Sequence, residues 1–160
     1  MTTHEEIRLE KNGVVVAYFA PNFQVTPIDA HDLKPFILPR GRGTRAKDLQ
    51  MWRGEITIQG EFEHSDNLPT AHRNALTTLF GHSPVTAMEQ VNRIRHFART
   101  TTGTYDLFVG ENSYNANTSD DVDIENGVFP PVFIMEIRPP RTSGLTRVNY
   151  MVQFLEGFQI

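Results

Sequence analysis

The chain has no cysteine among its 160 residues, and this absence excludes several kinds of protein at once. Without thiols there is no disulfide framework, no thiolate catalysis and no cysteine-ligated zinc or iron–sulfur cluster. Long apolar runs are also missing, because nowhere do the ~18 consecutive apolar residues of a membrane-spanning helix occur. The first ten residues carry acids where a secretory signal carries bases before an apolar run. We therefore expect a soluble, intracellular protein that is stabilised by packing or by partners.

An excess of basic charge is lacking too. The chain carries 15 lysines and arginines against 19 aspartates and glutamates, a formal net charge of −4. Such a molecule has no general attraction to nucleic acid, so any attraction to phosphates would be local. Hydrophobic residues make up 39% of the chain, which suits one ordinary core, and we expect a single domain over residues 1–160.

The sequence does not contain the motifs of common enzymes. There is no Gly-x-Ser-x-Gly turn for acyl transfer and no glycine-rich loop that follows a strand and opens a helix around a phosphate. Ser83 precedes a predicted helix, and capping that helix is a sufficient reason for it. We therefore predict no enzymatic activity and assign no catalytic residue.

The main pattern in the sequence is the alternation of apolar and polar residues. Trp52, Gly54, Ile56, Ile58, Gly60 and Phe62 alternate with polar residues, which predicts a strand with one face in a core and the other in water. A half-wet strand is typical of an antiparallel sheet. Further strands are predicted over residues 7–9, 14–20, 104–109, 128–137 and 146–154, and residues 128–137 are apolar enough to be buried on both faces.

Two helices are predicted between these groups of strands. Apolar residues recur at helical spacing over residues 69–80, with Gly81 in the position that follows a helix C-terminus. A second helix is predicted with Ser83 as its N-cap and Pro84 as its first residue. The fold class that follows is α+β and β-rich: an antiparallel two-sheet sandwich or open barrel with one or two flanking helices.

A long basic arm or loop is expected over residues 21–50, where prolines interrupt the pattern and only Phe36-Ile37-Leu38 forms an apolar island. Six cations stand against Asp48 alone from residue 34 to residue 53: Lys34, Arg40, Arg42, Arg45, Lys47 and Arg53. One interpretation is an element that follows phosphates, although it has few aromatic side chains on which bases could stack. The favoured interpretation is an interface with the acidic loop of a neighbouring copy, by which we mean residues 119–125. Its predicted residues are Arg40, Arg42, Arg45, Lys47, Arg53, Asp120, Asp121 and Asp123.

The same acidic loop has the alternating oxygen atoms that a hard cation such as calcium prefers, with Asp121, Asp123 and Glu125 as candidate ligands. An EF-hand loop needs glycine at its sixth position and glutamate at its twelfth, and no register supplies both. We therefore predict no metal ion and no other cofactor.

Histidines give an alternative function. None of the six is spaced as a helical zinc pair, but His64, Asp66 and His72 could meet in space. The alternative to an assembling subunit is a small β-rich module or enzyme that binds a ligand or metal near these three residues.

Two stretches resemble the tail-tube and distal-tail proteins of tailed viruses. They are the strand Trp52–Phe62, followed by a helical middle, and the C-terminal pair of apolar stretches, residues 130–140 and 147–154. The resemblance implies a tube-type β fold in which copies form a hexameric ring in the virion tail, assembled in the host cytoplasm. It further implies contacts with neighbouring tail or baseplate proteins, a long loop that touches the next ring, and DNA that at most passes non-specifically through a lumen. The family has no catalytic residues, so none carry over.

Overall fold

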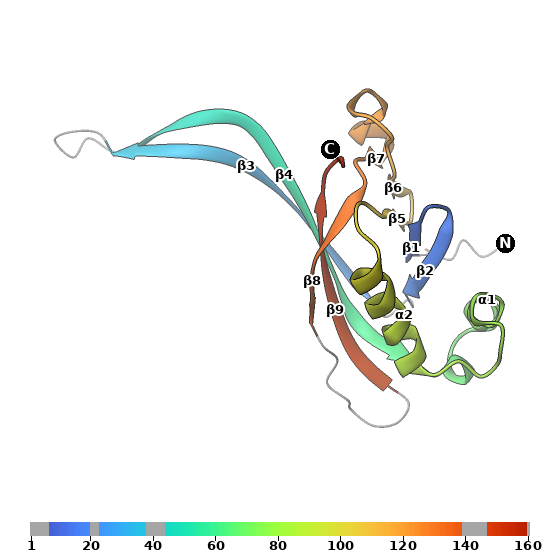
Figure 1. The fold of residues 1–160 in the computed structure, drawn as a ribbon. Helices are drawn as coiled ribbons and strands as arrows, with labels where there is room; N and C mark the ends of the chain where they lie inside the picture. Colours follow the sequence, from blue (N-terminus) through green and yellow to red (C-terminus); the bar gives the residue numbers. More distant parts are fainter. Residues whose placement is uncertain (1–6, 20–22, 38–43, 139–146, 160) are drawn as a thin grey trace.

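The chain folds into two packed β-sheets with two helices, an α+β sandwich (Figure 1). The structure is a computed structural model that describes residues 7–19, 23–37, 44–138 and 147–159, of which residues 31–37 and 44–52 are described as backbone only. Within these residues the strands do not close into a barrel. The sandwich branch of the expected fold class is therefore confirmed.

The first sheet contains five strands in the order β2-β1-β5-β6-β7. The turn Asn12-Gly13 joins the first two strands, and both residues have positive φ, 52° and 79°, as the tightest hairpin turns require. The pairs are antiparallel except for the parallel pair β6–β7. The bounds are β1 Ile7–Lys11, β2 Val14–Phe19, β5 Asp106–Val109, β6 Asn112–Tyr114 and β7 Val128–Phe129.

The second sheet contains four antiparallel strands in the order β3-β4-β9-β8. The predicted alternation is confirmed on its two central strands, where Ile56 and Ile58 of β4 are fully buried beside Phe154 and Val152 of β9. These side chains form the part of the core that the second sheet contributes. The bounds are β3 Gln24–Ile37, β4 Thr44–Glu63, β8 Val132–Arg138 and β9 Arg147–Glu156.

Helix α2 (Ala87–Thr100) packs against strands of both sheets, and its Val91 and Ile94 are fully buried. Helix α1 (Thr70–Phe80) packs on β2 and ends at Gly81, whose φ of 76° is the left-handed value expected after a helix. Short 3₁₀ turns complete the chain: η2 Ser65–Asn67, η3 Ser119–Asp121 and η4 Ile124–Asn126.

The predicted start of the second helix is wrong. Thr86 is the N-cap of α2, and its hydroxyl accepts a hydrogen bond from the Glu89 backbone N–H at 3.2 Å. The preceding residue Val85 is held by Ser65, because its N–H donates to the Ser65 hydroxyl at 2.8 Å and its carbonyl accepts from the Ser65 N–H at 2.9 Å. These two bonds keep the chain out of the helix until residue 86.

Most of the described part of the expected arm or loop over residues 21–50 belongs to the long β3–β4 hairpin, whose regular strands the sequence did not predict. Prolines such as Pro27 and Pro35 are tolerated in β3 because it is an edge strand. On an edge strand, only one side pairs with another strand, so a missing backbone N–H costs less than it does in a central strand. The hairpin projects away from the sandwich as an arm (Figure 1).

The predicted doubly buried strand over residues 128–137 is wrong as well. Pro130 and Pro131 divide it into β7 and β8, which belong to different sheets. Strand β8 is an edge strand and its Met135 is 49% exposed. The apolar composition of this stretch therefore does not indicate burial on two faces.

Candidate functional site

The most unusual feature of the described chain is the part of the β3–β4 hairpin that lies beyond the sandwich. Strand β9 pairs with β4 only over Glu55–Glu63, whereas the β3–β4 pairing continues from Ala30 opposite Arg53 to Ile37 opposite Thr44. We call residues 31–52 the hairpin arm. Within the described residues it is a two-stranded ribbon, and such ribbons are marginally stable in water unless something covers them.

The predicted basic interface residues fall in different parts of this hairpin. Arg45 and Lys47 lie on β4 within the hairpin arm, opposite Phe36 and Lys34, and only their backbone is described. Arg53 lies at the base of the hairpin arm, half exposed, with its Nε 3.3 Å from the Glu55 carboxylate. Arg40 and Arg42 lie outside the described residues.

Two of the predicted acidic residues accept hydrogen bonds from other residues of the same loop. The Asp121 carboxylate accepts from the Thr118 N–H and hydroxyl, both at 3.2 Å, and the Asp123 carboxylate accepts from the Asn126 amide at 2.6 Å. Asp120, Asp121, Asp123 and Glu125 are all exposed. Within the described residues there is no group of three His, Asp or Glu side chains placed to hold a metal ion.

The histidines also have local roles. The His64 ring accepts a hydrogen bond from the Asp66 N–H at 3.4 Å, and its Nδ1 lies 3.6 Å from the Asp66 carboxylate. His72 is buried in α1, with its ring edge-on to Tyr18 at 6.2 Å. The structure therefore brings His64 and Asp66 together as the cap of η2, and it places His72 in the packing between α1 and β2.

A groove with about 500 Å³ of space lies between the base of the hairpin arm and the acidic loop. Asp29, Gly54 and Glu156 line it from adjacent strands β3, β4 and β9. Asp29 is opposite Gly54 in the register, and the Glu156 carboxylate occupies the space that a Cβ on Gly54 would need. Its facing wall is apolar and consists of Val122, Ile124, Phe129 and Pro130.

The two carboxylates of this groove are held close to apolar surface. Burial, and then the charge of Asp29, raise the pKa of Glu156 to about 7. Burial, and then the charges of Glu156 and Asp29, raise the pKa of Tyr114 to about 12. Across the described part of the chain, neither Asp29 nor Glu156 has a hydrogen bond or an ion pair. Above about pH 7 the groove therefore presents uncompensated negative charge beside an apolar wall.

Sequence reasoning missed this pair, although one signal was present. Glu156 continues the alternation of Tyr150, Val152 and Phe154, which places it on the inner face of its strand. A carboxylate on an inner face needs an explanation. Asp29 gave no such signal, because its position depends on the register of the hairpin.

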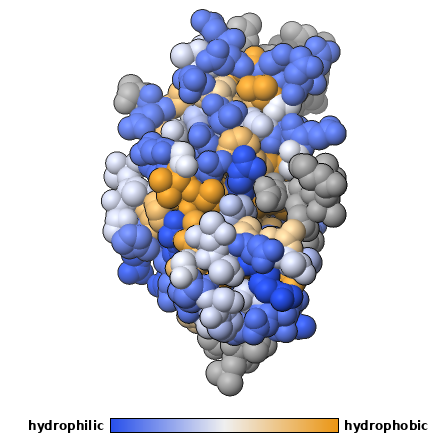
Figure 2. All heavy atoms as spheres, turned by 90° about the vertical axis from the view of Figure 1, so that its right-hand side faces the viewer, coloured by the Kyte–Doolittle hydropathy of each residue, from blue (hydrophilic) through white to orange (hydrophobic). Residues whose placement is uncertain are grey.

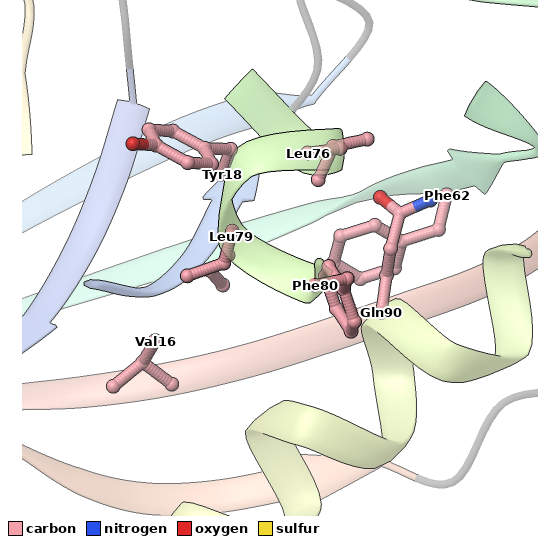
Figure 3. A pocket seen from close by; sticks show the side chains of 8 residues that line it. Val16, Tyr18, Phe62, Leu76, Leu79, Phe80 and Gln90 are labelled. Atoms are coloured by element: carbon pink, nitrogen blue, oxygen red, sulfur yellow. The ribbon is translucent and has the colours of Figure 1, made fainter. Parts of the chain in front are cut away.

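A narrow gap lies between β2, β4 and the two helices (Figure 3). It is surrounded by apolar side chains and by Gln90, whose amide donates to the Glu63 carbonyl at 2.8 Å. It is too narrow to admit a water molecule, so we regard it as part of the packing of α1 on the sandwich.

The face of the molecule turned away from the arm is largely hydrophilic, with hydrophobic residues in small patches (Figure 2). In the described part of the chain, neither helix has the length and apolar character needed to cross a membrane. The comparisons with known proteins add no relative, because no protein-family model matches the chain and no curated protein matches it significantly.

Proposed function

We propose that the protein is a non-catalytic structural subunit that assembles with copies of itself into a ring in the tail of a virus. The observation that carries this proposal is the hairpin arm, a two-stranded ribbon that leaves the sandwich and pairs with no other described strand. The unpaired backbone groups on its outer edges can pair with another chain, and such pairing would stabilise the ribbon. Another copy of the same chain is the partner that is always present.

The geometry of the second sheet supports a head-to-tail arrangement. Its two edge strands are β3 and β8, so each copy offers two different edges at opposite sides of one sheet. An interface between unlike surfaces repeats from copy to copy and closes into a ring when the rotation allows it. A symmetric dimer, in which the same surface of both copies meets, would use only one of these two edges.

Charge supports the same arrangement. The chain as a whole is acidic, yet residues 34–53 carry six cations and one acid. The acidic loop with Asp120, Asp121 and Asp123 is exposed on each copy. Opposite charge on two distant parts of one chain favours contact between copies and disfavours like-to-like contacts.

The viral assignment rests on the resemblance of the strands Trp52–Phe62 and Arg147–Phe154 to tail-tube and distal-tail proteins. On that basis the ring has six copies and belongs to the tube, its terminator or the baseplate. It is assembled in the host cytoplasm, contacts neighbouring tail proteins, and leaves a lumen through which DNA passes without specific binding.

The first test compares the full chain with a variant that has no hairpin arm. Because Ala30 and Arg53 are register partners, residues 31–52 can be replaced by Asn-Gly, which favours a tight hairpin turn. Size-exclusion chromatography with light scattering and negative-stain microscopy should find rings or tubes for the full chain and a folded monomer for the variant. A full chain that stays monomeric at every concentration contradicts the proposal.

Charge reversal tests the role of the basic residues. Arg40→Glu, Arg42→Glu and Arg45→Glu together should abolish the oligomer and leave the circular dichroism spectrum of the monomer unchanged. Arg95→Glu with Arg99→Glu on α2 is the control for added negative charge. Equal loss of assembly in both variants would assign the effect to net charge and not to the arm. The alternative function near His64, Asp66 and His72 predicts a strict monomer that binds a metal or a small ligand.

A further inference from the structure

The groove at the base of the hairpin arm is shaped by a missing side chain. Gly54 stands between Asp29 and Glu156, and the Glu156 carboxylate leans over it toward the Asp29 strand. Any larger residue at position 54 would fill this space. The glycine therefore lets two carboxylates share one side of the groove.

The opposite wall suits an apolar group. Ile124 is 63% exposed and forms part of this wall together with Val122 and Phe129. The Phe129 ring is stacked on that of the buried Tyr114 at 4.7 Å, which fixes its position. The occupant that satisfies both sides of the groove is a segment with a positive charge next to aliphatic or aromatic side chains.

The chain contains a segment of this composition that begins in strand β3. The apolar island Phe36-Ile37-Leu38 lies between Lys34 and Arg40, and Arg42, Arg45 and Lys47 follow. An arginine fork suits paired carboxylates, and its aliphatic stem suits the apolar wall. The complementarity therefore covers both charge and hydrophobicity.

The hairpin arm cannot fill the groove of its own chain. Phe36 lies seven residues beyond Asp29 along β3, which at about 3.3 Å per residue places it roughly 23 Å from the groove. The hairpin also points away from the sandwich (Figure 1). A hairpin arm that fills this groove therefore comes from a second copy.

We propose that this groove is the seat for the hairpin arm of a second copy, with Asp29 and Glu156 receiving an arm cation and the wall of Ile124 and Phe129 receiving the apolar island. The inference rests on the proposed self-assembly and adds the site at which it occurs. It differs from the sequence-based expectation, in which the exposed aspartates of the acidic loop receive the cations.

This seat makes docking depend on pH. The groups that face Glu156 are Asp29 from β3 and Tyr114 from β6, and the wall from residues 122–130 contributes only apolar lining. Since its pKa is about 7, Glu156 is largely neutral near pH 5 and largely charged near pH 8. An arm cation binds the charged form, so docking should strengthen as the pH rises through 7.

The test uses the full chain with Asp29→Asn and Glu156→Gln. Both changes keep the shape of the side chain and remove its charge, so the monomer should remain folded. The matched control is Glu111→Gln with Glu61→Gln, which neutralises two carboxylates that do not line the groove. Analytical ultracentrifugation should show a dissociation constant at least about tenfold higher for the groove variant and unchanged for the control.

A charge exchange guards against an indirect effect on folding. Asp29→Lys and Glu156→Lys, combined in one chain with Arg40→Glu, Arg42→Glu and Arg45→Glu, should assemble better than either set of changes alone. A wild-type chain that assembles while the groove variant does so equally well overturns this inference and leaves the proposed function standing. A wild-type chain that never assembles overturns both.

Discussion

Arg93 shows how one side chain of α2 secures the first sheet. Its guanidinium donates to the Val15 carbonyl at 2.7 Å and to the Val16 carbonyl at 3.0 Å. The β1–β2 register passes from Ala17 to Val15, so Val16 is the extra residue of a β-bulge. Burial lowers the pKa of Arg93 from its usual value, but the group remains a cation in ordinary buffers. Arg93 therefore satisfies carbonyl groups that the edge strand β2 leaves open.

Replacing Arg93 by methionine should destabilise the protein by about 1–3 kcal/mol, because two carbonyl groups lose a charged donor. Contacts of the guanidinium with the Phe80 and Phe97 rings, at 5.7 and 5.1 Å, add to the loss. The control Arg99→Met lies exposed on the same helix and should change the free energy of unfolding by less than about 0.5 kcal/mol. Urea denaturation at one protein concentration measures both, and equal effects would contradict the role of Arg93.

The start of α2 gives a prediction for a whole element. Thr86→Ala removes the hydroxyl that accepts from the Glu89 N–H and should cost about 1 kcal/mol of stability. Ser83→Ala should cost nearly nothing, because Ser83 is exposed and precedes the extended residue Val85. Thermal unfolding of the two variants separates these expectations, and the reverse order would place the cap at Ser83.

Elements with a clear period could be predicted from the sequence, and elements that depend on distant partners could not. The alternation in β4 and β9 and the apolar stripe of α1 were sufficient, because each encodes one buried face. The strands of the hairpin arm were not predicted because Pro27 and Pro35 are strand breakers, and only the sheet order reveals that β3 is an edge strand. The start of α2 was missed because Ser65, distant in the sequence, holds Val85.

Only the runs of basic and acidic residues in the candidate site could be predicted from the sequence. Arg53 and the loop aspartates stand in such runs, and charge patterning is why the sequence predicts them as interface residues. The groove required three facts at once: the register of Asp29 with Gly54, the position of Glu156 beside Gly54, and the approach of the wall with Ile124. Each depends on tertiary contacts that no local pattern encodes.

At the scale of the whole molecule, Glu156 links the stability of the monomer to pH. Its pKa is about 7 in the folded chain against an ordinary value of 4.5. Between these values the folded state holds a proton that the unfolded state has released. The contribution of Glu156 therefore favours folding at low pH and is lost as the pH rises through 7. Asp106 has a pKa raised mainly by burial and acts in the same direction, so only a comparison of variants isolates Glu156.

The variant without the hairpin arm makes this effect measurable, since it is expected not to assemble. Its melting temperature should fall between about pH 5 and pH 8, and Glu156→Gln in the same background should reduce the fall. Assembly of the full chain should change in the opposite sense, because the charged carboxylate that destabilises the monomer is the form that receives an arm cation. Light scattering across the same pH range measures this second profile. The proposed role of Glu156 in docking would be contradicted if assembly of the full chain weakened toward pH 8. It would also be contradicted if the Glu156→Gln variant showed the same dependence of assembly on pH as the full chain.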